Sequence, residues 1–155
     1  MKRALRTIFI VAIITMIGAT VGVAAEDGRF IVKSSETVLD TKTNLMWAAK
    51  DNGDNITWSD AKSYCENYRG GGYTDWRMPR GVELPGLYDE NKSYMAEPSK
   101  HNVHLTELIK LSNSCPWSSE LSRGSATYFD FRDGEWNWGY VNRKISSALP
   151  VRNAK

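Results

Sequence analysis

The spacing of apolar and polar positions predicts strands in the first part of the chain that follows the N-terminal apolar stretch. Arg29–Val32 is a short apolar run typical of a strand. Thr37–Leu39 and Leu45–Trp47 are two further β-prone runs, and the polar residues of Asp40–Asn44 between them are typical of a turn. We therefore expect a first strand followed by a β-hairpin.

The period then changes to that of an amphipathic helix between Trp58 and about Tyr68, where apolar residues recur every three or four positions. Thr57 is a typical N-cap residue, and Asp60 three positions later is a variant of the capping box. The glycine-rich run Arg69–Gly72 is expected to end the helix. The predicted apolar face consists of Trp58, Ala61, Tyr64, Cys65 and Tyr68.

Two further helical segments have weaker patterns. The first is Val82–Tyr88, which Pro85 is expected to shorten or distort because proline lacks a backbone N–H. The second is Leu105–Leu111, in which leucines are spaced by three residues. The polar segment Asp89–Asn102 between them is expected to be a loop.

From Cys115 onward the chain returns to strand patterns. Ala126–Phe131 and Trp136–Asn142 are predicted strands, joined by a turn at Arg132–Glu135. Ile145–Val151 is the last predicted strand. Early strands, two central helices and late strands together predict an α+β domain.

The central run Gly71–Pro79 follows neither the helical nor the strand period. We interpret Trp76 as a core residue and Asp75 as a brace for an irregular loop, because such a loop needs side chains to satisfy its backbone. Arg77 and Asp75 share a face if the segment is extended. Arg77 or Arg80 could then reach an anionic ligand.

The first 25 residues are predicted to be a signal peptide. Lys2, Arg3 and Arg6 precede an uncharged apolar stretch, and the small residues Val23–Ala25 are typical of a cleavage site. The alternative is an uncleaved inner-membrane anchor. Residues 26–155 are then one domain outside the cytoplasm, either periplasmic or secreted.

The charge of that domain gives no argument for nucleic acid as a partner. Without the three cations of residues 1–25, 17 Lys and Arg stand against 18 Asp and Glu, which gives a net charge of −1.

Cys65 and Cys115 are the two cysteines of the chain. An even number in an exported chain predicts a disulfide, and two buried free thiols are the rival interpretation.

Trp136, Trp138 and Tyr140 alternate along a predicted strand, so all three project from one face of it. An exposed aromatic face could stack on sugar rings, whereas large aromatic residues are equally typical of a core. We expect at least one of the three to be a core residue.

Candidate metal and catalytic motifs are weak. Asn137 between two tryptophans lacks the acidic residue of the lectin calcium motif, and Asp51–Asn55 lacks the carboxylates of a calcium loop, so a plain turn is expected. His101 and His104 have no third ligand near them in sequence. No nucleophile elbow, phosphate loop or zinc-protease motif is present in the chain.

Several motifs occur in an order that resembles the Lcl C-terminal domain family, a family long classed as a domain of unknown function. The similarity covers about residues 29–152. It is carried by the Leu-Met-Trp end of the hairpin, the capped helix, the Asp-Trp-Arg-Met-Pro run and the later Trp-Ser-Ser. Its motif residues include Trp47, Trp58, Asp75, Trp76, Arg77, Pro79 and Trp117.

This resemblance implies a C-type-lectin-like fold, with two main helices, a mixed or antiparallel twisted sheet and long loops. The family caps certain bacterial collagen-like adhesins, where the resemblance implies binding of sulfated polysaccharides. The related formylglycine-generating enzymes use a reactive cysteine pair. Two departures stand out: Pro150 occupies a place where members often carry a cysteine, and the chain has no Gly-X-Y tract.

We therefore expect an exported, non-catalytic binding module that recognises a polysaccharide or other glycan at the bacterial envelope or outside the cell. The alternatives are a module that binds another envelope protein and a degenerate enzyme of the formylglycine-generating type. No cofactor, metal or nucleic acid is expected. The predicted ligand contacts are Trp136, Trp138, Tyr140, Arg132 and Arg143.

Overall fold

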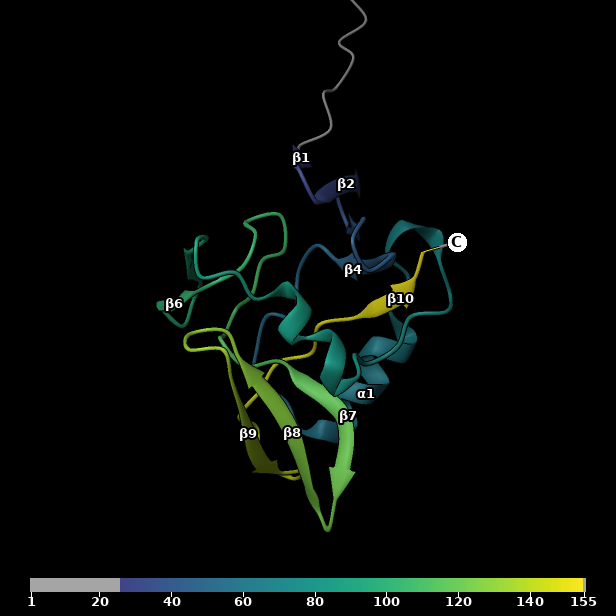
Figure 1. The fold of residues 1–155 in the computed structure, drawn as a ribbon. Helices are drawn as coiled ribbons and strands as arrows, with labels where there is room; N and C mark the ends of the chain where they lie inside the picture. Colours follow the sequence, from purple (N-terminus) through teal and green to yellow (C-terminus); the bar gives the residue numbers. More distant parts are fainter. Residues whose placement is uncertain (1–25, 155) are drawn as a thin grey trace, which may run out of the picture.

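The computed structural model describes residues 26–154 as a set of small antiparallel sheets with one α-helix at one side (Figure 1). The α+β class is therefore confirmed. The predicted signal peptide, residues 1–25, lies outside the described residues. Within them, no helix is both long and apolar enough to cross a membrane.

The first sheet has the strand order β1-β2-β3-β4-β10, with all neighbours antiparallel. The predicted hairpin is present as β3 and β4, and its turn is organised by Asp40. That carboxylate accepts hydrogen bonds from the Lys42 backbone N–H (3.0 Å) and the Thr43 hydroxyl (2.6 Å), so the turn residues satisfy one another. The five strands are Glu26–Asp27, Phe30–Ser34, Thr37–Asp40, Leu45–Ala48 and Val151–Asn153.

The predicted capped helix is confirmed as α1, Trp58–Asn67. The Thr57 side-chain oxygen accepts from the Asp60 backbone N–H, which satisfies one of the free donors of the first turn. A short 3-10 turn, η1 (Gly70–Gly72), follows the helix, and Gly71 takes a left-handed φ of 65° there.

The expected helix over Val82–Tyr88 is instead two consecutive 3-10 turns, η2 (Gly81–Glu83) and η3 (Pro85–Leu87). Pro85 has no backbone N–H to continue the hydrogen bonds of a helix, so a separate 3-10 turn begins at that residue. The predicted helix over Leu105–Leu111 is also wrong. Its N–H groups bond elsewhere: Lys110 donates to the Ala49 carbonyl and Leu111 to the Tyr94 hydroxyl.

The polar segment expected to be a loop contains a two-stranded sheet, β5 (Tyr94–Ala96) with β6 (His101–Val103). The third sheet has the order β7-β8-β9 and forms the lower part of the molecule in Figure 1. Its strands are Trp117–Ser122, Ser125–Asp130 and Glu135–Tyr140. The predicted final strand begins only at Val151, because Ser146 and Ser147 form isolated bridges to other segments.

Two buried clusters hold the sheets together. The larger joins the first sheet, the 3-10 turns and strand β8, and it includes Trp47, Leu84, Phe129 and Phe131, each at most 2% exposed. The smaller lies between α1 and the third sheet and includes Ala61, Cys65, Met78 and Trp117. The buried face of α1 thus packs against the third sheet.

The predicted disulfide is wrong, because Cys65 and Cys115 are both free and buried. Each thiol has its own surroundings: Cys65 packs in the cluster under α1, whereas the Cys115 sulfur contacts the Ser114 hydroxyl at 3.1 Å. Burial raises the pKa of the Cys65 thiol well above its ordinary value and that of Cys115 to about 12. Neither environment favours a reactive thiolate.

A thiol titration should therefore detect no reactive cysteine in the folded protein and two after unfolding, because the reagent reaches neither buried sulfur. The measurement is reaction with an aromatic disulfide reagent at pH 8, with and without guanidinium chloride. Quantitative loss of both thiols under denaturing, non-reducing conditions would indicate a disulfide and contradict the structure.

Candidate functional site

Strand β9 presents its aromatic side chains to solvent along one face of the third sheet. Trp136 is 39% exposed, Trp138 59% and Tyr140 69%. The expectation that at least one of them belongs to the core is therefore wrong. We call the surface formed by these three rings the aromatic surface.

The opposite face of β9 explains why the rings point outward. Gly139 is buried on that face, and a Cβ atom added there would lie 2.3 Å from Ile145 Cδ1 and 2.9 Å from the Trp117 ring. The inner face therefore has no room for a side chain at this position. Because side chains alternate across a strand, Trp138 and Tyr140 on either side of Gly139 lie on the opposite face, where both are exposed.

The register of the sheet gives the aromatic surface its shape. Trp138 lies opposite Thr127 and Tyr140 opposite Ser125 on β8, so small side chains flank these rings. Trp136 lies opposite Phe129, and the two ring centroids are 5.2 Å apart with an interplanar angle of 66°. Trp136 is therefore held by an edge-to-face contact with a core residue, whereas Trp138 and Tyr140 stand more freely.

Two hollows adjoin the aromatic surface. One has a volume of about 380 Å³ and includes Trp138, Tyr140, Arg143 and Ile145 in its lining. The other has a volume of about 480 Å³ and lies between the 3-10 turns and the sheet. Its lining residues are Gly81, Val82, Pro85, Glu120, Thr127 and Trp136.

The structure separates the two arginines predicted to accompany the aromatic residues. Arg143 lines the hollow beside Trp138 and Tyr140. Arg132 lies in the turn before β9, where its guanidinium binds the Asp130 carboxylate at distances from 2.5 to 3.0 Å. That hydrogen bonding raises the pKa of Arg132. Arg132 is thus already paired, and Arg143 is the better placed cation.

The other sequence-predicted motif residues have structural roles. Trp47 is fully buried in β4, and Trp76 is 3% exposed. Pro79 accepts a hydrogen bond from Ser119 N–H at its carbonyl (2.8 Å), which joins the motif to β7. The indole N–H groups of Trp58, Trp76 and Trp117 donate to the carbonyls of Ser118, Gly70 and Ile56, respectively.

Asp75 and Arg77 flank Trp76 but pair with different residues. Asp75 accepts hydrogen bonds from the Arg152 guanidinium at 2.6 and 3.1 Å, and Arg77 forks onto both oxygens of Glu83 at 2.7 Å. Arg80 also binds Glu83. Both arginines proposed for an anionic ligand are therefore held by a carboxylate.

The remaining polar candidates each contact separate partners in turns and loops. Asp51 is buried and accepts hydrogen bonds from Gly53 N–H (3.0 Å) and from Ser112, as in a turn. The His101 and His104 rings contact different partners, the Asn113 side chain and the Lys92 carbonyl. Residues 26–154 contain no group of three or more potential metal-ligating side chains.

Sequence reasoning missed one wall of the second hollow. Val82 is 81% exposed and lines that hollow together with Pro85 and Trp136. A helix over Val82–Tyr88 would be expected to pack its apolar residues inward, so the pattern gave no signal for an exposed valine. Only Pro85, which interrupts a helix, indicated that this segment would not pack as one.

A sequence search finds no match among curated proteins. The model of one protein family, described as the Lcl C-terminal domain, matches residues 36–152, which is most of the chain. The domain that carries the aromatic surface thus belongs to the Lcl C-terminal domain family.

Proposed function

We propose that this protein is a non-catalytic binding module that recognises a polysaccharide through the aromatic surface. The observation that carries the proposal is the exposure of Trp136, Trp138 and Tyr140 at alternate positions of one strand. Stacked sugar rings repeat along a glycan chain, and three rings in a row offer repeated apolar faces to them.

The exposure of three large aromatic side chains gives up stability and favours association, and this supports a binding role. Large apolar side chains contribute most to stability when buried, and a contiguous exposed patch promotes association. Trp and Tyr nevertheless suit recognition, because they offer large, rigid contact areas with few rotatable bonds to order. The two adjacent hollows add concave surface that a ligand on the rings can also contact.

The charge next to the rings favours a ligand with anionic groups. Arg143 lines the hollow formed by Trp138 and Tyr140 and is exposed. A sulfated or carboxylated sugar that stacks on these rings would place a negative group near this cation. The proposed ligand class is therefore an acidic polysaccharide, and the electrostatic part of its binding should weaken with salt.

We also propose the finer fold and the location that the sequence suggests. The α+β domain would be a C-type-lectin-like domain, and the chain would be exported, with residues 1–25 removed as a signal peptide. A polysaccharide ligand belongs in the periplasm or outside the cell. Determination of the N-terminus of the protein from the envelope and culture fractions tests cleavage, and Met1 retained in the membrane fraction would indicate an anchor.

Replacing Trp138 with alanine should weaken polysaccharide binding by about tenfold or more, because truncation of an exposed aromatic anchor removes a contact without disturbing the core. Trp138→Phe should retain part of the affinity. The measurement is titration with dextran sulfate, with neutral dextran as the uncharged counterpart, at low and high salt.

Met95→Ala is the matched control, because Met95 is also exposed (53%) but lies on β5 in another sheet. Its affinity should equal that of the unmodified protein. Equal binding by the Trp138→Ala variant, or failure of the unmodified protein to bind any of a panel of acidic and neutral polysaccharides, would overturn the proposed function.

A second candidate function is a contact with another envelope protein. Strand β9 is an edge strand, since within residues 26–154 it pairs only with β8. An edge strand can add a strand from a partner, and aromatic residues are enriched at such interfaces. Capture of one defined envelope protein by the unmodified domain but not by Trp138→Ala, without glycan binding, would favour this function.

A further inference from the structure

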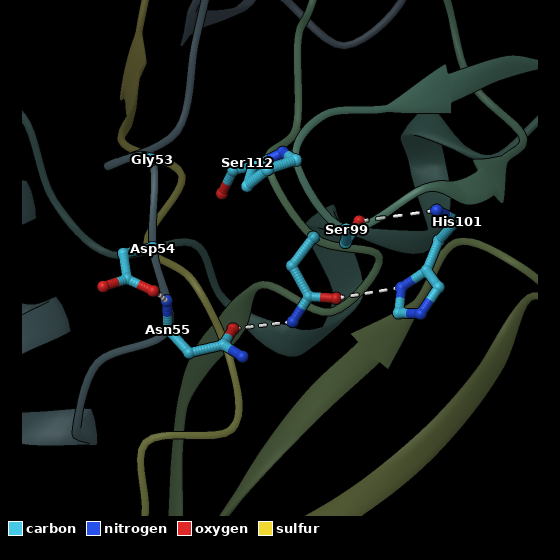
Figure 2. Close-up of a pocket in the computed structure, with 8 residues that line it drawn as sticks. Gly53, Asp54, Asn55, Ser99, His101 and Ser112 are labelled. Carbon is cyan, nitrogen blue, oxygen red and sulfur yellow. Dashed lines mark hydrogen bonds between the residues drawn. The ribbon is translucent and has the colours of Figure 1, made fainter.

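A polar pocket lies away from the aromatic surface, where the loop after β4 meets the β5–β6 hairpin and the segment before β7 (Figure 2). Its volume is about 280 Å³, several times the roughly 30 Å³ that one liquid water occupies. Six of its eight lining residues have polar side chains: Asp54, Asn55, Ser99, His101, Ser112 and Asn113.

The buried carboxylate of Asp51 holds the two sides of this pocket together. It accepts hydrogen bonds from the Gly53 N–H on one wall and from both the N–H and the hydroxyl of Ser112 on the other, at 2.9 to 3.0 Å. Burial raises the pKa of Asp51. The pocket walls are thus tied by three hydrogen bonds to one side chain, which gives the pocket a defined shape.

A chain of hydrogen bonds fixes the orientation of the polar groups inside it. The Ser114 N–H donates to Asn113 Oδ1 (2.7 Å), so that atom is the amide oxygen and Nδ2 donates to Asn55 Oδ1 (2.6 Å). His101 Nδ1 lies 3.1 Å from the same Asn113 oxygen and must therefore donate to it. Figure 2 shows Asn55 and His101 bonded in this way to the amide between them.

The chain leaves specific groups available to a ligand. Within the described residues 26–154, Asn55 Nδ2 and His101 Nε2 have no hydrogen-bond partner. In the tautomer that carries its proton on Nδ1, the Nε2 atom is an acceptor, while Asn55 Nδ2 is a donor. The exposed Asp54 carboxylate adds a further acceptor, since only its Oδ1 is bonded, to the Asn55 N–H at 2.7 Å.

The charge of the lining restricts the ligand class. Asp54 is the one acidic side chain among the lining residues, and no Lys or Arg accompanies it. A phosphate, sulfate or carboxylate would meet repulsion without a compensating cation. A hydroxyl group both donates and accepts, so neighbouring hydroxyls match the alternation of Asn55 donor with His101 and Asp54 acceptors.

We propose that this pocket binds a single neutral, hydroxyl-rich unit of monosaccharide size. Asn55 and His101 orient the ligand through the fixed hydrogen-bond chain, and Asp54 accepts from a further hydroxyl. The site shares no lining residue with the hollows beside the aromatic surface, so it is independent of the proposed polysaccharide function. It differs from that function in selecting against acidic ligands.

The test is a titration of the full folded domain, observed by the backbone amide signals of a ¹⁵N-labelled sample. The probes are glucose, mannose, galactose and N-acetylglucosamine, with inorganic sulfate as the anionic comparison. We expect saturable shifts of the Asn55, Ser112 and Asn113 amides with at least one sugar, no saturable shift there with sulfate, and unchanged amides in β9.

Asn55→Ala should weaken that sugar's binding by about tenfold, because it removes a donor from the pocket. The matched control is Asn102→Ala, an exposed asparagine on β6, which should bind as the unmodified protein does. The proposal fails if no sugar gives saturable shifts at these amides in the unmodified protein, if sulfate binds there more tightly, or if well-folded Asn55→Ala binds equally. None of these results bears on polysaccharide binding by β9.

Discussion

Replacing Glu83 with glutamine is expected to lower the free energy of unfolding by about 3 kcal/mol at neutral pH. The Glu83 side chain is only 5% exposed, and it accepts hydrogen bonds from the Arg77 guanidinium, the Arg80 guanidinium and the Arg80 backbone N–H. Two cations and a backbone donor thus converge on one buried carboxylate. Glutamine removes the charge and keeps only one acceptor oxygen, while its NH2 group is a donor that meets the remaining donors.

The pKa of Glu83 supports this magnitude. Burial alone would raise it, but the hydrogen bonds from Arg77 and Arg80 outweigh burial and lower it from 4.5 to about 2. At about 1.4 kcal/mol for each pKa unit, the difference corresponds to about 3 kcal/mol. Because the folded-state pKa lies below the unfolded one, this stabilisation is complete above about pH 4.5 and is lost as the pH falls toward 2.

Guanidinium chloride unfolding at several pH values measures this effect. The difference between the unmodified protein and Glu83→Gln should be largest near neutral pH and shrink between pH 4.5 and pH 2. Glu66→Gln is the control, because Glu66 pairs with Lys62 on the exposed face of α1 and should change stability by less than about 1 kcal/mol. A pH-independent difference would contradict the assigned role of the charge.

Replacing Asp75 with alanine is expected to cost about 2 kcal/mol, although Asp75 itself is 44% exposed. The reason lies in its partner, since Arg152 is 3% exposed and its guanidinium is 3.8 Å from the centre of the Tyr73 ring. Without the carboxylate, a buried cation keeps its ring contact but loses two charge-assisted hydrogen bonds.

A double-mutant cycle distinguishes this explanation from simple loss of packing. Combining Asp75→Ala with Arg152→Met should recover part of the stability lost in Asp75→Ala, because methionine fills the site without an unpaired charge. Glu97→Ala, which breaks the exposed pair with Lys100, is the control and should have little effect. If Asp75→Ala also has little effect on the free energy of unfolding, the Asp75–Arg152 pair does not stabilise the loop.

Both predictions concern the Asp-Trp-Arg-Met-Pro run and connect it to the candidate site. Asp75 ties the run to β10, Trp76 enters the core, and Arg77 binds Glu83 at the end of η2. Gly81 and Val82 of η2 form one wall of the hollow beside Trp136. The motif therefore positions one wall of this hollow, while its own residues do not line the hollow.

Local patterns predicted the parts of the fold whose stability is local. The turn centred on Asp40 and the Thr57 cap are satisfied by hydrogen bonds between residues at most three apart, so the hairpin and α1 were predictable from neighbouring residues. The aromatic residues were placed on one face of a strand for the same reason, because alternation along an extended chain is a local property.

The features that the sequence alone did not determine depend on distant partners. The segment Leu105–Leu111 has helical spacing, yet Ala49 and Tyr94 take its backbone donors. The even number of cysteines in a chain expected to be exported suggested a disulfide, but the folded chain buries the two thiols separately.

For the candidate site, the sequence determined that Trp136, Trp138 and Tyr140 share a face, whereas the tertiary structure decided which face met solvent. Ile145 and Trp117 close against Gly139 and leave no room on the inner side. The polar pocket likewise exists only because Asp51 binds Ser112, 61 residues further along the chain. The spacing of residues along the sequence shows which side chains share a face. Which distant residues pack against that face is decided only when the chain folds.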